Sequence, residues 1–578
     1  MTGPAAPKDP EKARPFFYIL KDKDIFGERQ KDGTGIQFIY ESDGRLINSA
    51  QITGNVTDKE ELTLLETVEG FGRLVHSIGV SVETDRPEET AEFVFQMYGK
   101  KDLYGGGTNL TASLKCDGME HRIYLSDYRW TEDDHVPGQI KILFAAPERM
   151  GKVSVRLFLN DGYEAPPEEE DLVIDMHSEE YCGMISRSLL QLGNPYRIRK
   201  AIEKSKAGKE VTLAYIGGSI TQGAGAIPIH TECYAYKSFQ LFQNRFSTQN
   251  NVRFIKAGVG GTPSELGMIR FDRDVLREEE RPDIVVIEFA VNDEGDETKG
   301  VCYESLVRKV LKLPWKPAVV LLFSVFANDW NLQERLRPVG DLYDLPMVSI
   351  RDAVTPQFSL KCGEGRILSK NQFFYDIFHP NNIGHTIMAD CLQYLFECCD
   401  AAEPARVGTF VEGMTEEQIL SEKLSGPAVI GADFERIFLL DKKNRYVGAK
   451  IRAGGFASTD MELQSVEMDG NLTQTPEFPY NWMYDGSRLQ MPGFEMEITC
   501  KSLFLIFKDS GETDVGKANV FVNDVYCMTA DPHKNNWLHC NAVLLFWETE
   551  SRSHKVRIAV TEEDRNKKFT ILGFGYTI

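Results

Sequence analysis

The chain has 578 residues, which is too long for one ordinary hydrophobic core, so we expect two to four domains. Its formal net charge of −22 argues against a nucleic-acid-binding protein, which needs basic faces, and against binding to anionic membrane surfaces. Hydrophobic residues make up 42% and charged residues 26%, as in soluble globular proteins, and no apolar run is long enough to span a bilayer.

The N-terminus and the cysteines bear on location. Residues 1–15 are polar and proline-rich and lack the apolar segment of a secretory signal. The 11 cysteines form no C-x-x-C pair and no cluster with zinc spacing, so we expect reduced thiols and no metal site. Together these features predict a cytoplasmic protein. The alternative is a secreted protein whose signal segment has been removed.

Residues from about 15 to 180 carry short alternating or aromatic-rich runs separated by Gly, Asp and Asn, which predict β-strands in a sandwich or jelly roll. The predicted strands are 16–22, 36–42, 91–99, 121–128, 139–146 and 152–161. A segment rich in Pro and Glu follows at 163–172 and predicts an exposed loop or a domain boundary.

From about 183 to 402 strands and helices alternate, which predicts a doubly wound α/β sheet of parallel strands. The apolar runs at 211–218, 252–259, 283–291 and 318–325 are typical of buried parallel strands. Helices are expected at 234–246, 264–276, 303–313 and 383–399. The β pattern then returns, with strands expected at 436–442, 447–455, 495–500, 502–509, 518–524, 542–548, 555–561 and 569–578. The predicted domains are therefore 1–182, 183–404 and 405–578, with the α/β domain between two β-sandwich or jelly-roll domains.

The first motif that can carry chemistry follows a central strand, where ligand-binding groups of open α/β sheets lie. Gly217 and Gly218 permit a tight turn that presents the hydroxyl of Ser219 at the sheet edge, and the Ser219 N–H can face a developing oxyanion. A phosphate-binding loop or an ordinary strand–helix turn is the alternative, although neither GxxxxGK[ST] nor GxGxxG is present.

Two further strand ends carry candidate oxyanion donors. Gly258, Gly260 and Gly261 lie between a strand and a helix that Thr262 or Ser264 could cap, and a backbone N–H of this turn can face an oxyanion; a plain glycine turn is the alternative. Asn292 follows a strand that we expect to end at Val291, and its side-chain N–H is a suitable donor. Capping of the next segment is the alternative for Asn292.

The fourth motif contains Asp376 and His379, three positions apart, which on a helical or turn-like segment face the same side. The carboxylate can then orient the imidazole while the other ring nitrogen accepts a serine proton. The alternative is a capping pair before a helix whose first turn holds Pro380. His385 lacks the spacing and is expected to be a helix residue.

The ordered set GGSIT, AGVGGT, AVND and DIFHP resembles the four blocks of the SGNH (GDSL-like) hydrolase superfamily, over roughly residues 183–402. The resemblance implies a flavodoxin-like fold, Ser219 as nucleophile, His379 as general base and then acid, and Asp376 as its orienting carboxylate. It also implies an oxyanion hole of the Ser219 amide, the Gly261 amide and the Asn292 side chain, with no metal and no cofactor. Gly261 is chosen over Gly260 because aligning the glycine block places the donor there.

One position departs from the family pattern, because Gly218 stands where an Asp usually precedes the serine. This puts a close match to lipase-like and thioesterase-like branches in doubt. With its two β flanks, the chain looks similar to multidomain carbohydrate O-acetyl esterases acting on xylan, mannan or xyloglucan. The alternatives are a sialate O-acetylesterase, a lipid or thioester acylhydrolase, or a non-catalytic carbohydrate-binding protein. The expected partner is an acetylated carbohydrate, without nucleic acid or membrane. Candidate sugar-binding residues are Trp537, His533 and Trp482, with burial in a β core as the alternative.

Overall fold

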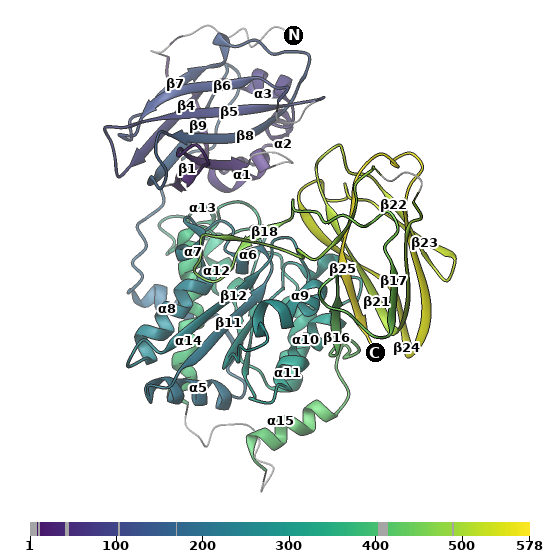
Figure 1. The fold of residues 1–578 in the computed structure, drawn as a ribbon. Coiled ribbons are helices and arrows are strands. Elements are labelled where there is room, and N and C mark those ends of the chain that lie inside the picture. The colour runs from purple at the N-terminus through teal and green to yellow at the C-terminus, as the bar shows by residue number, and fades with distance from the viewer. Residues whose placement is uncertain are drawn as a thin grey trace.

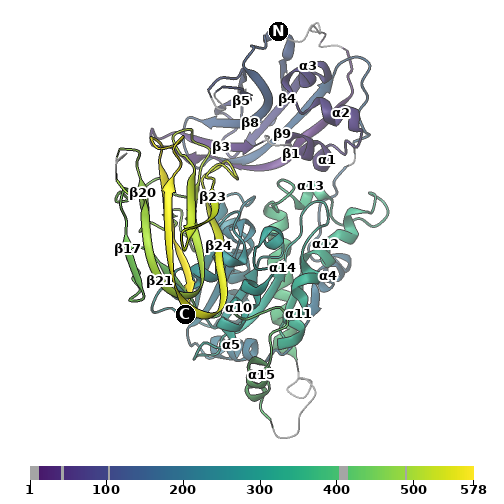
Figure 2. The same cartoon turned by 90° about the vertical axis from the view of Figure 1, so that its right-hand side faces the viewer.

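The computed structural model describes residues 9, 12–40, 45–101, 105–168, 170–402, 414–487 and 491–578. The predicted boundary between residues 404 and 405, the last two residues of the predicted strand 36–42, and most of the N-terminal residues 1–15 lie outside these ranges. Figures 1 and 2 both place the N-terminal sheets over one end of the central part and the C-terminal sheet against its side.

The N-terminal part consists of two antiparallel sheets around one hydrophobic core. The first sheet has the order β1 (Phe16–Phe26), β9 (Met150–Leu159), β4 (Val75–Thr84), β7 (His121–Tyr124). The second has the order β2 (Glu28–Arg29), β3 (Gly35–Tyr40), β8 (Asp134–Phe144), β5 (Thr90–Gly99), β6 (Asn109–Lys115). Three helices join them: α1 (Arg45–Thr53), α2 (Lys59–Leu64) and α3 (Val68–Leu74).

The strands predicted here are confirmed, with one shortened, and three further strands were not predicted. The strand expected at 121–128 ends at Tyr124, and the 3-10 turn η1 (Leu125–Asp127) follows it. The strands that were not predicted are β2, β4 and β6. In β4 the burial pattern is almost continuous, so the alternation that identifies a half-exposed strand is missing.

The central part is a twisted α/β sheet with helices on both faces, as predicted. Its order is β10 (Leu189–Gln191), β15 (Met347–Ser349), β14 (Ala318–Phe323), β13 (Ile284–Glu288), β11 (Val211–Gly217), β12 (Val252–Gly258), all parallel except for the edge strand β10. Strands β10 and β15 were not predicted, because three residues give no periodicity.

The central helices divide between two hydrophobic clusters, one on each face of the sheet. One face carries α4 (Glu179–Ser186), α5 (Tyr196–Lys206), α8 (Tyr234–Phe246), α12 (Ile350–Phe358) and α14 (Asn382–Ala401). The other carries α9 (Ser264–Phe271), α10 (Val301–Leu311) and α11 (Gln333–Tyr343). Short helices occupy the loops: α6 (Ser219–Gln222), α7 (Ile229–Glu232), α13 (Lys370–Phe373), the 3-10 turn η3 (Asp293–Gly295) and the π-helical turn η2 (Asp272–Leu276). Helix α8 matches its predicted range, and α9 with η2 covers 264–276.

The C-terminal part begins with α15 (Glu416–Ser425) and is otherwise antiparallel β-structure. Its main sheet has the order β16 (Ile437–Leu440), β25 (Phe569–Thr577), β21 (Phe494–Asp509), β24 (His539–Val560), β22 (Ala518–Val522), β23 (Val525–Ala530). Strand β17 (Ala449–Arg452) pairs with β21, β20 (Trp482–Tyr484) pairs with β25, and β18 (Ser465–Glu467) forms a hairpin with β19 (Gln474–Pro476).

The long strands β21 and β24 each replace two predicted strands. Their register shifts between Cys500 and Ser502, and again between Leu503 and Phe504. Such irregularities interrupt the alternation of side chains without ending the ladder, so the sequence pattern breaks where the strand does not.

Candidate active site

Strands β11, β12 and β13 end at the same edge of the central sheet, which brings the loops that carry the sequence motifs together. Gly217 at the end of β11 pairs with Gly258 of β12 on one side and with Glu288 of β13 on the other. The loops that follow all three strands therefore leave the same edge of the sheet, and Figure 1 shows this edge, marked by α6, facing the N-terminal sheets.

Ser219 is the first residue of α6, directly after the turn at Gly217 and Gly218. Its Oγ lies 2.9 Å from Nε2 of His379, although 160 residues separate the two in the chain. This distance allows a direct proton transfer from the hydroxyl group to the imidazole.

Asp376 and His379 lie in a bend that an isolated bridge between Phe374 and Pro380 closes. Asp376 Oδ2 and Oδ1 lie 2.9 and 3.0 Å from His379 Nδ1. Asp376 Oδ1 also accepts the backbone N–H groups of Phe378 (2.7 Å) and His379 (2.9 Å). The predicted i, i+3 relation is thus realised in a bend. Pro380 precedes Asn381, the N-cap of α14, so that helix begins after Pro380 as expected, and the alternative with Pro380 in its first turn is not realised.

Gly260 and Gly261 follow β12 and differ in their backbone N–H groups. The Gly260 N–H donates to Gln222 Oε1 at 2.9 Å. The Gly261 N–H donates no hydrogen bond within the described ranges, and φ of Gly261 is +71°, a conformation that favours glycine. Of the two, Gly261 has the N–H that a ligand can use.

Asn292 lies further beyond its strand than the sequence predicts. Strand β13 ends at Glu288 rather than at Val291, and Asn292 precedes the short turn η3 without a side-chain capping bond. The capping alternative is therefore not realised. The Asn292 carboxamide packs against Gly218, where an ideal Cβ would lie only 2.3 Å from Asn292 Oδ1.

Helix α9 is not capped by Thr262 or Ser264, which corrects a second expectation. Pro263 occupies the N-cap, and the Thr262 hydroxyl donates to the Val259 carbonyl at 2.8 Å. Asp293 Oδ1 instead accepts the Ser264 N–H at 2.7 Å. Asp293, a buried residue of η3, thus connects this turn to the first residue of α9.

Glu288 is a buried group beneath the site that sequence reasoning did not single out. The Thr221 hydroxyl of α6 donates to Glu288 Oε2 at 3.1 Å. Burial raises the pKa of Glu288 to about 7, against smaller lowering effects of hydrogen bonds from Ser324 and Thr221 and of the His379 charge. A lone Glu inside an otherwise apolar strand was the available signal.

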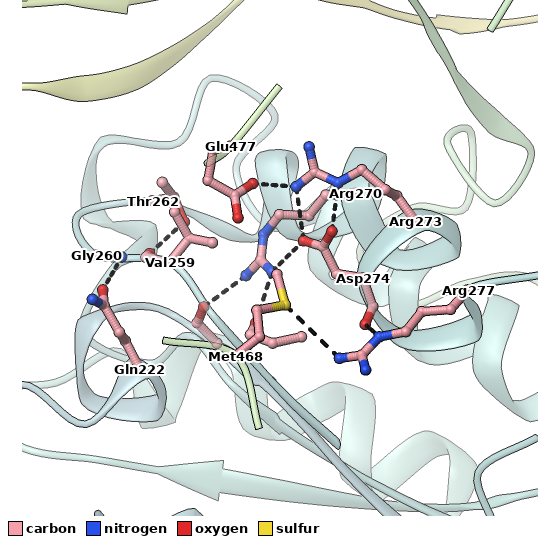
Figure 3. Close-up of polar contacts among 12 residues, drawn as sticks. Gln222, Val259, Gly260, Thr262, Arg270, Arg273, Asp274, Arg277, Met468 and Glu477 are labelled. Atoms are coloured by element: carbon pink, nitrogen blue, oxygen red, sulfur yellow. Dashed lines mark hydrogen bonds and ion pairs between the residues drawn. The ribbon is translucent and has the colours of Figure 1, made fainter. Parts of the chain in front are cut away.

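Arg270 of α9 is a second unpredicted residue, and its hydrogen bonds hold the ends of two strands together (Figure 3). Its fully buried guanidinium donates to the carbonyl of Gly217 at 2.8 Å and to that of Ala257 at 2.7 Å. It also pairs with Asp274 at 3.0 Å, and Asp274 pairs with Arg273. The turn before Ser219 and the end of β12 are thus held by one side chain.

Both flanking parts of the chain reach this site. Lys23 of β1 is buried, and its Nζ donates to the carbonyls of Asn371 (3.2 Å) and Phe374 (2.5 Å), just before the bend with Asp376. On the other side Arg273 pairs with Glu477 of the C-terminal part (Figure 3).

The predicted sugar-binding residues fall in two places, an exposed loop and the C-terminal core. Trp537 is 45% exposed and contacts Gly261, where an ideal Cβ would lie 2.8 Å from Trp537 Cζ2. His533 lies on the same loop, and its Nε2 is 3.0 Å from the Glu512 carbonyl oxygen. Trp482 is 5% exposed and packs against Phe494 and Phe574 in the C-terminal core. Trp482 therefore has no surface to offer a sugar, and the burial alternative holds for it.

His385 lies in α14, as predicted, and burial lowers its pKa to about 3.

Among the described residues, no group of His, Cys, Asp and Glu side chains is arranged to hold a metal ion. No helix in the described ranges combines the length and apolar character that crossing a bilayer requires.

Residues 215–387, which include all of the Ser219, Asn292 and His379 motifs, match the family model of the GDSL-like Lipase/Acylhydrolase family. The resemblance to the SGNH (GDSL-like) hydrolases is confirmed. A search of curated proteins found no match to the chain. Among solved structures 71 chains match.

One similar structure is a two-domain esterase active on acetylated mannans, with 24% identity and a TM-score of 0.55, covering 68% of this chain and 98% of that one. The same enzyme co-crystallised with mannopentaose gives 23% identity and a TM-score of 0.53, with the same coverage. At these identities the likeness shows a shared fold, and it extends well beyond the matched GDSL-like segment.

Proposed function

We propose that the protein is a serine esterase that removes O-acetyl groups from plant-type polysaccharides or oligosaccharides such as xylan, mannan or xyloglucan. The observation that carries the proposal is the 2.9 Å contact between Ser219 Oγ and His379 Nε2, with Asp376 on the other ring nitrogen. The match of residues 215–387 to the GDSL-like family supports a carboxylic ester hydrolase.

The proposed reaction has two acyl-transfer steps and needs no cofactor. His379 Nε2 takes the Ser219 proton as Oγ attacks the ester carbonyl, and Asp376 stabilises the resulting imidazolium. The carbonyl oxygen becomes an oxyanion that the N–H groups of Ser219, Gly261 and the Asn292 side chain stabilise. His379 returns the proton to the leaving sugar hydroxyl. A water molecule, deprotonated by His379, then attacks the acetyl carbonyl; the bond to Ser219 Oγ breaks, acetate leaves, and His379 returns the proton to Oγ.

Replacement of the nucleophile tests the reaction. Ser219→Ala should lower kcat for 4-nitrophenyl acetate by about a thousandfold or more, as in other Ser–His hydrolases. Ser359→Ala is the matched control, because Ser359 is exposed and belongs to the same α/β part of the chain. Activity of a homogeneous Ser219→Ala preparation close to that of the control would refute the proposal.

A cavity beside the catalytic bend supports a carbohydrate substrate. It has a volume of about 350 Å³ and is lined by the carboxamides Asn48, Gln51 and Asn328 together with Phe378. The Phe378 ring lies 6.1 Å from that of His379 and is 37% exposed. Apolar surface combined with a few polar groups is typical of small-molecule sites of this size. The pair Asn48→Ala/Gln51→Ala should raise KM for acetylated oligosaccharides and leave KM for 4-nitrophenyl acetate unchanged.

Trp537, with His533 on the same loop, is proposed as a sugar platform because its ring covers Gly261 and is still half-exposed. Trp537→Ala should raise KM for acetylated oligosaccharide but not for an aryl acetate. Trp547 is a matched control, since it is 42% exposed, lies in the same C-terminal part and packs on Phe434 instead. Equal effects of Trp537→Ala on both substrates would contradict the platform.

Substrate range separates the remaining alternatives. The similar two-domain esterase acts on acetylated mannans, so acetylated mannan oligosaccharides should be tested first, with xylan and xyloglucan beside them. A preference for long-chain 4-nitrophenyl esters would instead favour a lipid acylhydrolase, and release from acetylated sialate would favour a sialate O-acetylesterase.

The proposal includes the three-domain division at 1–182, 183–404 and 405–578, with sandwich or jelly-roll flanks. One adjustment assigns α4 to the central domain, because Tyr181 of α4 donates to Asp390 of α14 at 2.5 Å. We also propose that the protein is cytoplasmic, which the 11 free cysteines support.

A further inference from the structure

Gln464, just before β18 in the C-terminal part, places its carboxamide inside the catalytic part of the molecule. The side chain is 8% exposed. Its Nε2 donates to the Gly260 carbonyl at 3.0 Å, and its Oε1 accepts the Cys540 N–H at 3.0 Å. The Gln464 carbonyl accepts the Glu477 N–H at 2.8 Å. The carboxamide is therefore anchored to β24 at one end and holds Gly260 with the other.

The Gly260 carbonyl belongs to the same peptide group as the Gly261 N–H. A trans peptide is planar, and its C=O and N–H point in opposite directions. A donor that fixes the direction of the carbonyl therefore also fixes the direction of the N–H. Gln464 stands on the carbonyl side, so it determines where the Gly261 N–H points.

The preceding peptide is fixed from the side of the nucleophile. The Gly260 N–H donates to Gln222 Oε1 at 2.9 Å, and Gln222 ends the short helix that Ser219 begins (Figure 3). An ideal Cβ at Gly260 would lie 3.7 Å from the Cβ of Ser219, so this turn borders the serine. Two carboxamides, Gln222 of the central part and Gln464 of the C-terminal part, thus hold the N–H and the carbonyl of Gly260.

We propose that Gln464 is a positioning residue that orients the Gly260–Gly261 peptide, so that the Gly261 N–H faces the oxyanion formed on attack by Ser219. The inference rests on the proposed esterase function. It makes the C-terminal part a component of the catalytic site in addition to any role in binding sugar. The hydrogen bond on the carbonyl also polarises the peptide and strengthens its N–H as a donor.

Two rings of the C-terminal part lie beside this peptide, Trp537 in the loop before β24 and His539 at the start of β24. They stack at 4.5 Å and contact Gly261, with His539 Cε1 at 3.0 Å from an ideal Cβ there. His539 is buried. Gly260 is itself buried, so water has little access to its carbonyl in place of Gln464. An orphaned carbonyl in such a place favours rotation of the peptide, which would turn the Gly261 N–H away.

Gln464→Leu tests the inference with 4-nitrophenyl acetate, a substrate too small to need the sugar sites. We expect kcat to fall by about ten- to a hundredfold, which approaches the loss of kcat on removing one oxyanion donor. KM should change less than about twofold. Gln474→Leu is the matched control, because Gln474 is an exposed glutamine on the adjacent strand β19. A wild-type kcat for Gln464→Leu would overturn the inference.

Gln464→Glu keeps the shape of the side chain and answers the objection that the leucine variant fails to fold. The introduced carboxyl group can donate to the Gly260 carbonyl only when protonated. The ratio of its kcat to that of the wild type should therefore fall as pH rises from 5 to 9, while titrations common to both proteins cancel. Of the neighbouring groups, His539 has its pKa lowered to about 4 by burial, and burial raises the pKa of the Cys540 thiol well above its ordinary value. The Glu477 carboxylate pairs with Arg273 in both proteins.

A folded Gln464→Glu variant, as judged by circular dichroism and its melting temperature, with a ratio independent of pH would also overturn the inference. The proposed function fails in a different way, through an active Ser219→Ala protein. If Ser219→Ala is inactive and both Gln464 variants behave like the wild type, the esterase assignment stands and the positioning role does not.

Discussion

Gly218 departs from the family pattern, and its surroundings predict what a side chain there would do. An ideal Cβ at Gly218 would lie 2.3 Å from Asn292 Oδ1, 2.5 Å from Cγ and 2.6 Å from Nδ2. Since ordinary van der Waals contact begins near 3.4 Å, the carboxamide must shift by about 1 Å. The φ of Gly218 is −87°, a value that other residues also adopt.

The expected magnitude follows from the distance tolerance of an oxyanion donor. Donors act at about 2.7–3.1 Å from the oxyanion, so a shift of about 1 Å removes the Asn292 N–H from useful range. Asn292 Oδ1 is buried without a partner among the described residues, so no hydrogen bond on that atom resists the displacement. Gly218→Ala should therefore cost about as much as Asn292→Ala, a factor of about 100–1000 in kcat, or roughly 3–4 kcal/mol.

The assay is kcat for 4-nitrophenyl acetate in a double-mutant cycle. Once Asn292→Ala has emptied the space, Gly218→Ala should have little further effect, so the two changes should be far from additive. Gly218→Asp, which restores the usual residue of the family, should be at least as damaging as Gly218→Ala. Near-wild-type kcat for Gly218→Ala, or full additivity in the cycle, would refute this reasoning.

Three other predictions concern buried charges around the site. Burial raises the pKa of Glu288 to about 7, so the native state binds more protons than the unfolded chain between about pH 4.5 and 7, and stability falls as pH rises through that window. In the wild type, the free energy of unfolding measured with urea should therefore be lower at pH 8 than at pH 5, and Glu288→Gln should reduce this difference by about 3 kcal/mol. A variant with the same difference as the wild type would contradict the prediction. Lys23→Met should lower the free energy of unfolding by about 2 kcal/mol, because the carbonyls of Asn371 and Phe374 lose their charged donor, and urea midpoints equal to the wild type would show otherwise. Arg270→Met should destabilise by about 3–5 kcal/mol in the same assay, since the carbonyls of Gly217 and Ala257 lose their charged donor and buried Asp274 loses an ion-pair partner. A loss below about 1 kcal/mol would count against the bracing role.

Local sequence was sufficient for four of the six described strands of the central sheet. Four continuous apolar runs and the periodic helices between them predict parallel strands covered on both faces, and β11 to β14 follow. The carboxyl-edge rule then predicts that the loops after β11, β12 and β13 meet, which places Ser219, Gly261 and Asn292 together. The order of the motifs, together with the spacing of Asp376 and His379, was enough to name the candidate triad.

Sequence periodicity fails where the signal is short or interrupted. The edge strands β10 and β15 are three residues each, and the register shifts in β21 and β24 make single strands look like pairs. The end of β13 was placed three residues late because Phe289, Ala290 and Val291 are apolar for a different reason: they are buried in the loop after the strand.

What the sequence alone determined is the set of groups that can react, because each motif is local and its chemistry follows from residue types and spacing. What only the tertiary structure decided is which groups hold them in place. Gln464 contacts Gly260 from 204 positions away, and Lys23 contacts Phe374 from 351 positions away. A long-range contact between a single polar side chain and a backbone carbonyl leaves no periodicity or motif in either segment, so it becomes visible only when the three parts of the chain are packed together.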